Sequence, residues 1–212
     1  MSVHGGTRRY VAGLSLALMA GFVDGFGFVF LGGYFVSFMS GNTTQAGAEL
    51  VQGSFGSAAF CAALIVCFVA GSAAGTATAL TGVRPAGRVL ALVAAALVIA
   101  ALFAGAEALL PTGAALAFGM GAVNTVFSRD GVAAGGITYM TGALMKVGEG
   151  IVAALRGRDR TGWLRYLGMW AAIAAGAILG AAAMRLGTTA LWAPAAATLI
   201  AAIVVLTRRR GA

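Results

Sequence analysis

The sequence contains very few charged residues. Asp, Glu, Lys and Arg make up 9% of its 212 residues, whereas an ordinary soluble domain carries roughly a quarter. Hydrophobic residues make up 60%. This composition excludes a soluble fold and leaves no room for a soluble enzymatic domain. A chain of this length accommodates about six membrane-spanning helices of roughly 20 residues each.

Side chains for metal binding or catalysis are equally scarce. The single histidine, His4, has no other metal ligand beside it, so we predict no metal site and no cofactor. Cys61 and Cys67 share one apolar run and lie too far around a helix to form an undistorted disulfide. The sequence has no G-x-S-x-G motif and no catalytic dyad of recognisable spacing. We therefore predict that the protein is not an enzyme.

Lysine and arginine outnumber the acidic residues by 14 to 6, which gives a net charge of +8. These residues occur in short clusters between apolar runs, where they act as topology signals, so we predict no nucleic-acid partner. The apolar runs cover residues 10–30, 57–80, 88–110, 114–128, 164–184 and 189–207. Residues 34–50 and 132–152 are further segments predicted at membrane depth. The lipid bilayer is the expected surrounding of the chain.

The basic clusters predict an orientation. With six spans, all of them fall on one side of the membrane: Arg8 and Arg9, Arg84 and Arg88, Arg156, Arg158, Arg160 and Arg165, and Arg208, Arg209 and Arg210. The opposite loops contain Glu49, Glu107 and Arg185. The positive-inside rule therefore places both termini in the cytoplasm.

Residues 20–47 and 120–148 are two copies of one motif. Corresponding residues lie 100 apart before a one-residue insertion and 101 apart after it: Gly21, Val23 and Asp24 match Gly121, Val123 and Asn124, and Met39, Ser40 and Gly41 match Met140, Thr141 and Gly142. We predict an all-α integral membrane protein with two halves, residues 1–110 and 111–212. Because each half has three spans, an odd number, the second enters the membrane from the opposite side, and the repeats are inverted.

Two G-x-x-x-G motifs support the same division. Gly71 and Gly75 lie in the second predicted span, and Gly176 and Gly180 lie in the fifth. Small residues at this spacing let helices approach closely in lipid. We assign these glycines a packing role.

Each half contains a predicted break in its helices. Gly32 and Gly33 precede the aromatic, β-branched and small residues 34–38, and Gly135 and Gly136 precede residues 137–139, a composition that disfavours a helix. The polar residues from Ser40 to Thr44 are suited to capping a new helix. Such a break exposes backbone N–H groups at membrane depth, and these must face protein, water or a ligand.

Two short helices starting at these breaks predict an anion site, because a helix N-terminus carries roughly half a positive charge and several free donors. The predicted substrate-binding residues are Ser40, Gly41, Asn42, Thr43, Asn124, Thr141, Gly142 and Lys146. Lys146 has two interpretations: it adds a charge to this site, or it is an interfacial lysine whose ammonium group reaches water. Glu149 is placed to pair with it.

Asp24 is an ionisable residue within a predicted span, where an unpaired carboxylate costs at least a few kcal/mol. It is a candidate proton-coupling residue, cation ligand or partner of Lys146. The structural alternative is a hydrogen bond that locks the two halves together, which Asn124 can also provide. We favour the functional role over the structural one and predict that Asp24 is the proton-coupling site.

These features predict a secondary transporter for a small anion or carboxylate-bearing metabolite, held between two half-helix N-termini. The alternatives are a passive anion channel and a non-transporting membrane scaffold or assembly factor. A homodimer is compatible with helices that face lipid on all sides.

Three motifs carry a resemblance to a known family: G-F-V-D at residues 21–24, F-M-S-G-N-T at residues 38–43 and T-Y-M-T-G-A-L at residues 138–144. The chain resembles, over nearly its whole length, the YoaK-like family of small bacterial integral membrane proteins, a family of unknown function. The resemblance implies a bacterial inner-membrane protein with about six helices, and it brings no established substrate.

Overall fold

The chain is predominantly helical in the part that the structure describes. The computed structural model describes residues 3–81, 83–127 and 137–208, and no strand occurs in these ranges. Four residues that entered the predictions, Gly135, Gly136, Arg209 and Arg210, lie outside them. In lipid, a helix satisfies its backbone hydrogen bonds within one segment, which is why an apolar chain of this kind folds into helices.

Within the described residues, five helical segments are long and apolar enough to cross a membrane. They contain α1 (Val3–Phe30), α3 (Phe55–Leu80), α4 (Pro85–Gly105), α7 (Trp163–Ala183) and α8 (Trp192–Thr207), and the last segment, Thr188–Thr207, includes the short helix before α8. The short 3₁₀ helices η1 (Met184–Leu186) and η2 (Thr188–Leu191) connect α7 to α8. The predicted span at residues 114–128 is instead α5 (Leu109–Val123), which is apolar but has 15 residues. At 1.5 Å per residue it is about 22 Å long, shorter than a hydrocarbon core of roughly 30 Å.

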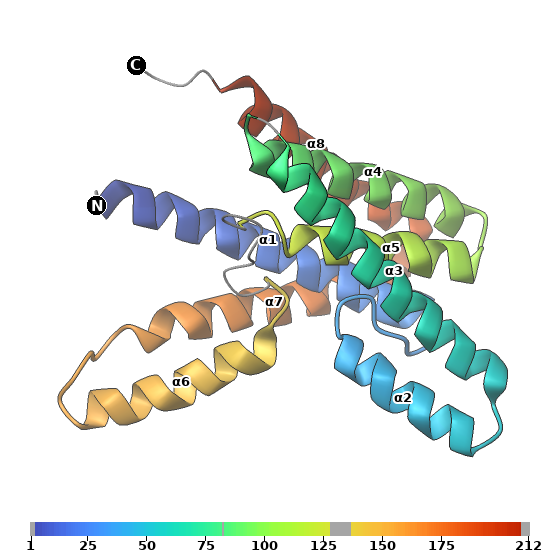
Figure 1. Cartoon of the computed structure of the whole chain (residues 1–212), viewed down its shortest axis with the longest axis horizontal. Helices are drawn as coiled ribbons and strands as arrows, with labels where there is room; N and C mark the ends of the chain where they lie inside the picture. Colours follow the sequence, from blue (N-terminus) through green and yellow to red (C-terminus); the bar gives the residue numbers. More distant parts are fainter. Residues whose placement is uncertain (1–2, 82, 128–136, 209–212) are drawn as a thin grey trace.

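The two remaining helices are the short helices predicted after the breaks, α2 (Met39–Val51) and α6 (Met140–Leu155). In Figure 1 both begin near the middle of the molecule and run toward opposite ends, α6 toward the end where the two termini lie. The N-termini of α2 and α6 therefore point inward. The predicted all-α architecture is confirmed, with five long helices, one shorter apolar helix and these two half-helices.

The long helices pack in pairs: α1 lies along α7, α3 lies along α5, and α4 packs against both α5 and α8 (Figure 1). Much of α4 is buried, including Val93, Leu97 and Ala100, so the core of the molecule surrounds this helix. Pro85 begins α4 at the position where its missing N–H costs no hydrogen bond.

Glycines make the two main crossings close. A methyl group at Gly176 or Gly180 of α7 would collide with the backbone of α1 at Leu18 or Phe22. The same holds for Gly71 of α3 against the backbone of Phe118 on α5. A methyl group at Gly75 would collide with the hydroxyl of Thr125, which follows α5, and would crowd the backbone of Ala122. The packing role predicted for the two G-x-x-x-G motifs is confirmed, because only small residues allow backbones to approach this closely.

The two crossings use corresponding residues. Gly21 of α1 meets the carbonyl of Ile173 on α7, and Gly121 of α5 meets the carbonyl of Phe68 on α3. The glycines differ by 100 (121 − 21) and their partners by 105 (173 − 68). Gly71 and Gly176 differ by 105 as well, and the carbonyls that they meet, at Phe118 and Leu18, differ by 100.

The connections between helices divide between two ends of the molecule. Both termini and the α3–α4 and α6–α7 connections lie toward one end, and the α2–α3 and α4–α5 connections lie toward the other (Figure 1). The connections at the first end contain Arg84, Arg156, Arg158 and Arg160, together with Asp159. Glu107 lies in the α4–α5 connection, and Arg185 lies in the α7–α8 connection. The arginines are therefore concentrated in the connections at the end where the termini lie.

Candidate functional site

The break after α1 begins with two glycines. Gly32 and Gly33 have φ angles of 76° and 106°, which L side chains rarely adopt. The N–H of Gly33 donates to the carbonyl of Phe28 at 2.8 Å, a bond that closes the end of α1. The predicted break in the first half is thereby confirmed.

Side chains hold the backbone of this first break. The N–H groups of Val36 and Ser37 donate to Oδ1 of Asp24 at 3.1 and 2.9 Å. Asn42 is fully buried, and its Oδ1 accepts the N–H of Phe35 at 3.0 Å while its Nδ2 donates to the Phe35 carbonyl at 2.6 Å. Three backbone N–H groups of the break, at Phe35, Val36 and Ser37, are thus bonded to side chains.

Asn124 performs the same task in the second half. Its Oδ1 accepts the N–H of Thr138 at 3.0 Å, and its Nδ2 donates to Oγ1 of Thr138 at 3.0 Å and to the carbonyl of Met120 at 2.9 Å. Thr138 and Ser37 differ by 101 (138 − 37), so Asp24 and Asn124 hold corresponding backbone positions. Each bond joins a helix to the break within its own half. Within the described residues, the structural alternative of a hydrogen bond from Asp24 or Asn124 that locks the two halves together is therefore not found.

The starts of α2 and α6 differ from the prediction. α2 begins at Met39 with Phe38 as its N-cap, α6 begins at Met140 with Tyr139 as its N-cap, and neither has a side-chain cap bond. The expected capping role of Ser40 to Thr44 is wrong, because these residues lie inside α2. The hydroxyl of Thr43, for example, donates to the carbonyl of Met39 at 2.8 Å.

An aromatic ring folds over the first turn of each half-helix. A methyl group at Gly41 would collide with the ring of Phe38, and one at Gly142 would collide with the ring of Tyr139. Because both glycines lack a side chain, the N-cap rings lie directly against the helix starts.

A cavity of about 460 Å³ lies between the two helix starts, within the usual size of small-molecule sites. Four consecutive residues of each half line it, together with Asn124 and Phe68: Ser37, Phe38, Met39 and Ser40 from the first half, and Thr138, Tyr139, Met140 and Thr141 from the second. The backbone N–H groups of Ser40 and Thr141 have no acceptor within the described chain. Residues with hydroxyl groups and aromatic rings therefore line the cavity, and the first turns of both half-helices border it.

The structure brings together three of the predicted binding residues, Ser40, Asn124 and Thr141. The others do not line this cavity. Gly41 and Gly142 lie beneath the aromatic rings, Asn42 holds the break, and Thr43 bonds within α2. These four residues shape the helix starts without facing the cavity.

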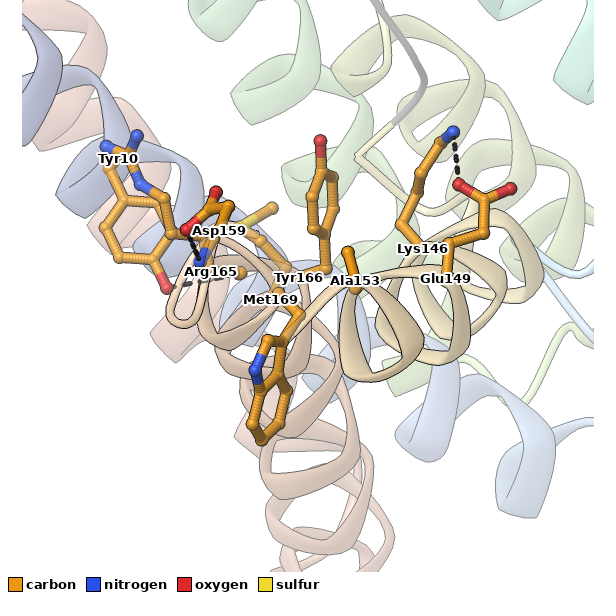
Figure 2. Close-up of a pocket in the computed structure, with 11 residues that line it drawn as sticks. Tyr10, Lys146, Glu149, Ala153, Asp159, Arg165, Tyr166 and Met169 are labelled. Atoms are coloured by element: carbon orange, nitrogen blue, oxygen red, sulfur yellow. Dashed lines mark hydrogen bonds and ion pairs between the residues drawn. The ribbon is translucent and has the colours of Figure 1, made fainter. Parts of the chain in front are cut away.

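Lys146 is also absent from this cavity. Its ammonium group pairs with Glu149 at 2.8 Å, as the i+3 spacing predicted, and both line a separate cavity beside α7 (Figure 2). The prediction of Lys146 as the partner of Asp24 is wrong. Its role as a substrate ligand stays a prediction, and the structure places the side chain outside the cavity between the half-helices. The side chain is 48% exposed, which agrees with the interfacial alternative.

Asp24 lines a different cavity, of about 340 Å³, between α1, the first break and α7. The other lining residues are uncharged: Gly25, Phe28, Phe35, Ala177, Ile178 and Ala181. Asp24 therefore does not line the cavity between the half-helices. It accepts the backbone N–H of Ser37, which does line that cavity.

Sequence reasoning missed several lining residues. Ser37 and Thr138, and Phe38 and Tyr139, are pairs at the same offset of 101, so extending the repeat comparison by three residues would have identified them. Phe68 comes from the neighbouring helix α3. Nothing in the local sequence distinguishes it from other apolar residues of that helix.

Comparison with known proteins identifies relatives along nearly the whole chain. The family model described as "Protein of unknown function (DUF1275)" matches residues 12–204. The chain is 39% identical over 198 residues to the UPF0700 transmembrane protein RA0705 of Rhizobium meliloti (strain 1021), a match that covers 91% of this chain and 86% of that protein. No solved structure matches. The chain therefore belongs to the DUF1275 family of transmembrane proteins of unknown function, which is the YoaK-like family that its motifs resemble.

Proposed function

We propose that the protein is a secondary transporter of a small anion or carboxylate-bearing metabolite, bound between the N-termini of α2 and α6. The observation that carries this proposal is the cavity of about 460 Å³ lined by the first residues of both half-helices. Ser40 and Thr141 each direct an unpaired backbone N–H from a helix start, and such groups bind anions well.

The chemistry of the cavity supports an anion of modest size. Ser37, Ser40, Thr138 and Thr141 carry hydroxyl groups that can donate hydrogen bonds, and no acidic side chain lines the cavity among the described residues. A carboxylate bound there would receive donors from both halves of the protein. The aromatic rings of Phe38 and Tyr139 would contact an apolar portion of the solute.

We assign Asp24 the proton-coupling role, exerted through the position of the first break. An ionised carboxylate is a stronger hydrogen-bond acceptor than a protonated one, so protonation weakens its hold on Val36 and Ser37. Ser37 lines the solute cavity. Proton binding at Asp24 would therefore loosen one wall of that cavity without contact between the proton and the solute.

The two halves, residues 1–110 and 111–212, are proposed to be inverted repeats. Support comes from the matched glycine crossings and from the matched bonds of Asp24 with Ser37 and of Asn124 with Thr138. We place the protein in the bacterial inner membrane with both termini in the cytoplasm, because the arginine-rich connections lie at the same end as the termini. The protein has no enzymatic activity in this proposal.

The test is solute flux in proteoliposomes. Purified protein is reconstituted, and uptake of chloride, sulfate, formate, acetate and lactate is measured with and without an imposed pH gradient. Saturable uptake that the gradient drives supports the proposal. Lys146→Gln is the control, because Lys146 lies outside the cavity and its loss should leave uptake unchanged.

Asp24→Asn separates a coupled transporter from a passive anion channel. The neutral hydrogen bonding of Asn124 favours the channel as the second candidate, because it shows that an amide can hold a break. In a coupled transporter the variant loses gradient-driven accumulation. In a channel it retains downhill flux, and the wild type never accumulates solute. Absence of flux for the whole panel, with folded protein, contradicts both and favours a membrane scaffold.

A further inference from the structure

A second cavity, of about 610 Å³, lies between α6, α7 and the N-terminal part of α1 (Figure 2). It shares no lining residue with the cavity between the half-helices. Lys146, Arg165, Tyr10, Trp163 and Tyr166 lie around it, with Met169 deeper along α7. The proposed transport mechanism uses none of these side chains.

The cavity lies where α7 enters the membrane. α7 belongs to an apolar segment, Trp163–Leu186, long enough to span the bilayer, and Trp163, Arg165 and Tyr166 occupy its first turn. Tryptophan and tyrosine concentrate at the boundary between the hydrocarbon and the headgroups. Along α7 the lining thus changes from aromatic and charged at the helix start to apolar at Met169.

Two basic and two acidic side chains line the cavity: Lys146 and Arg165, with Glu149 and Asp159. The connection between α6 and α7 adds three arginines outside the lining, at positions 156, 158 and 160. Glu149 is paired with Lys146, and Oδ1 of Asp159 accepts the backbone N–H groups of Thr161 and Gly162.

Arg165 has no carboxylate partner within the described residues. Its guanidinium lies 5.1 Å from the centre of the Tyr10 ring, and the hydroxyl of Tyr10 donates to the Arg165 backbone carbonyl at 3.2 Å. These contacts position the guanidinium beside the cavity and leave its hydrogen-bond donors available for an anion.

We propose that this cavity binds the headgroup of an anionic phospholipid, with the phosphate at Arg165 and an acyl chain along α7 toward Met169. A lipid of the bilayer fits this cavity better than a free anion. Its phosphate group would contact the arginine, and its acyl chain would contact the apolar wall, whereas a free anion would leave that wall uncovered. Arginine pairs with phosphate through two parallel hydrogen bonds, and basic pockets between membrane helices bind anionic headgroups.

Trp163 provides a direct readout of lipid at this cavity. In the double variant Trp170→Phe, Trp192→Phe it is the single tryptophan of the chain. This protein is reconstituted into phosphatidylcholine vesicles that contain an equal mole fraction of either brominated phosphatidylglycerol or brominated phosphatidylcholine. Bromine quenches tryptophan on contact, so the two curves report which lipid occupies the cavity. We expect phosphatidylglycerol to be preferred about fivefold.

Matched variants locate the preference. In Arg165→Gln, the preference for phosphatidylglycerol over phosphatidylcholine should fall to a ratio close to one. Arg158→Gln removes the same charge from the α6–α7 connection, outside the cavity, and should reduce this ratio only slightly. Arg165→Lys should retain most of it, which shows that the first variant acts through charge and not through misfolding. Arg185→Gln, at the far end of α7, should have no effect.

Three outcomes overturn the proposal. Equal quenching by the two lipids means that the cavity does not select an anionic headgroup. Equal losses in Arg165→Gln and Arg158→Gln mean that the attraction is spread over the basic surface. Loss of the preference when inorganic phosphate replaces chloride at constant ionic strength means that the cavity binds a free anion instead of a lipid.

Discussion

The two breaks, one after α1 and one after α5, use corresponding positions but different chemistry. In the first, the carboxylate of Asp24 holds two backbone N–H groups and Asn42 holds a third residue. In the described part of the second, the amide of Asn124 holds Thr138, and Ala143 stands where the first half has Asn42 (143 − 42 = 101). Among the described residues, the first break is therefore held by more side-chain bonds, and one of its acceptors is an ionisable carboxyl group.

This difference suggests different roles for the two breaks that border the cavity between α2 and α6. Both halves place four consecutive residues and a free helix donor at the cavity between α2 and α6. A wall fixed by a neutral amide keeps its position at any physiological pH, whereas a wall fixed by a carboxylate responds to proton binding. We infer that the second half forms the constant side of the cavity and that the first half forms the side that moves.

The largest expected effect is on stability, at the two residues that hold the breaks. Asp24→Ala leaves the N–H groups of Val36 and Ser37 unpaired, and hydrogen bonds to a charged group contribute about 1.5–3 kcal/mol each. We expect a loss of roughly 3 kcal/mol or more for Asp24→Ala and about half as much for Asn124→Ala. Thermal unfolding in detergent measures both, and equal losses would remove the distinction between the breaks.

The second prediction concerns the symmetry of the helix crossings. Gly21→Ala and Gly121→Ala each push a methyl group into a backbone carbonyl of the neighbouring helix. Overpacking of this kind costs about 1–3 kcal/mol, and the two losses should be similar because the two contacts correspond.

Two other glycines provide the matched control for this pair. Gly47 and Gly148 lie on α2 and α6, also 101 apart, and a methyl group there meets no neighbour. Replacing either with alanine should leave stability unchanged or raise it by up to about 1 kcal/mol. A large loss at only one of the two crossings would argue against repeats that pack alike.

The third prediction isolates Asn42, which has no counterpart in the second half. Asn42→Ala removes both bonds to Phe35 and leaves a buried N–H unpaired, at a cost of about 1–2 kcal/mol. Thr43→Ala is the control, because the Thr43 hydroxyl is exposed and bonds within its own helix. If both variants unfold at the wild-type temperature, Asn42 does not hold the break.

Much of the fold followed from the sequence, because apolar length and the repeat each leave a direct pattern. The spans at residues 10–30 and 57–80 agree with α1 and α3 to within a few residues, apart from the longer N-terminal part of α1. The site was predicted only in part. Ser40 and Thr141 line the cavity as expected, since the start of a half-helix is visible in the sequence.

The incorrect predictions share a physical cause. Asn42 looks like a capping residue, but its burial lets it bond to the break, and the helix starts before it. Lys146 lies six residues along α6, where the helix has already carried its side chain away from the cavity to Glu149. Local spacing identifies where a helix can start, whereas the direction of each side chain depends on packing between segments distant in the sequence.

The smallest expected effect tests whether both halves contact the solute. Ser40→Ala and Thr141→Val each remove one hydroxyl group from the cavity lining. One neutral hydrogen bond contributes about 0.5–1.5 kcal/mol, so each variant should raise the KM for uptake by about two- to tenfold with little change in kcat. Thr44→Ala, on α2 but outside the cavity, should leave the KM unchanged. A solute held between two helix starts requires both substitutions to weaken uptake. If Ser40→Ala alone raises the KM, then the solute contacts only the half whose wall depends on Asp24, and the second half serves as a frame.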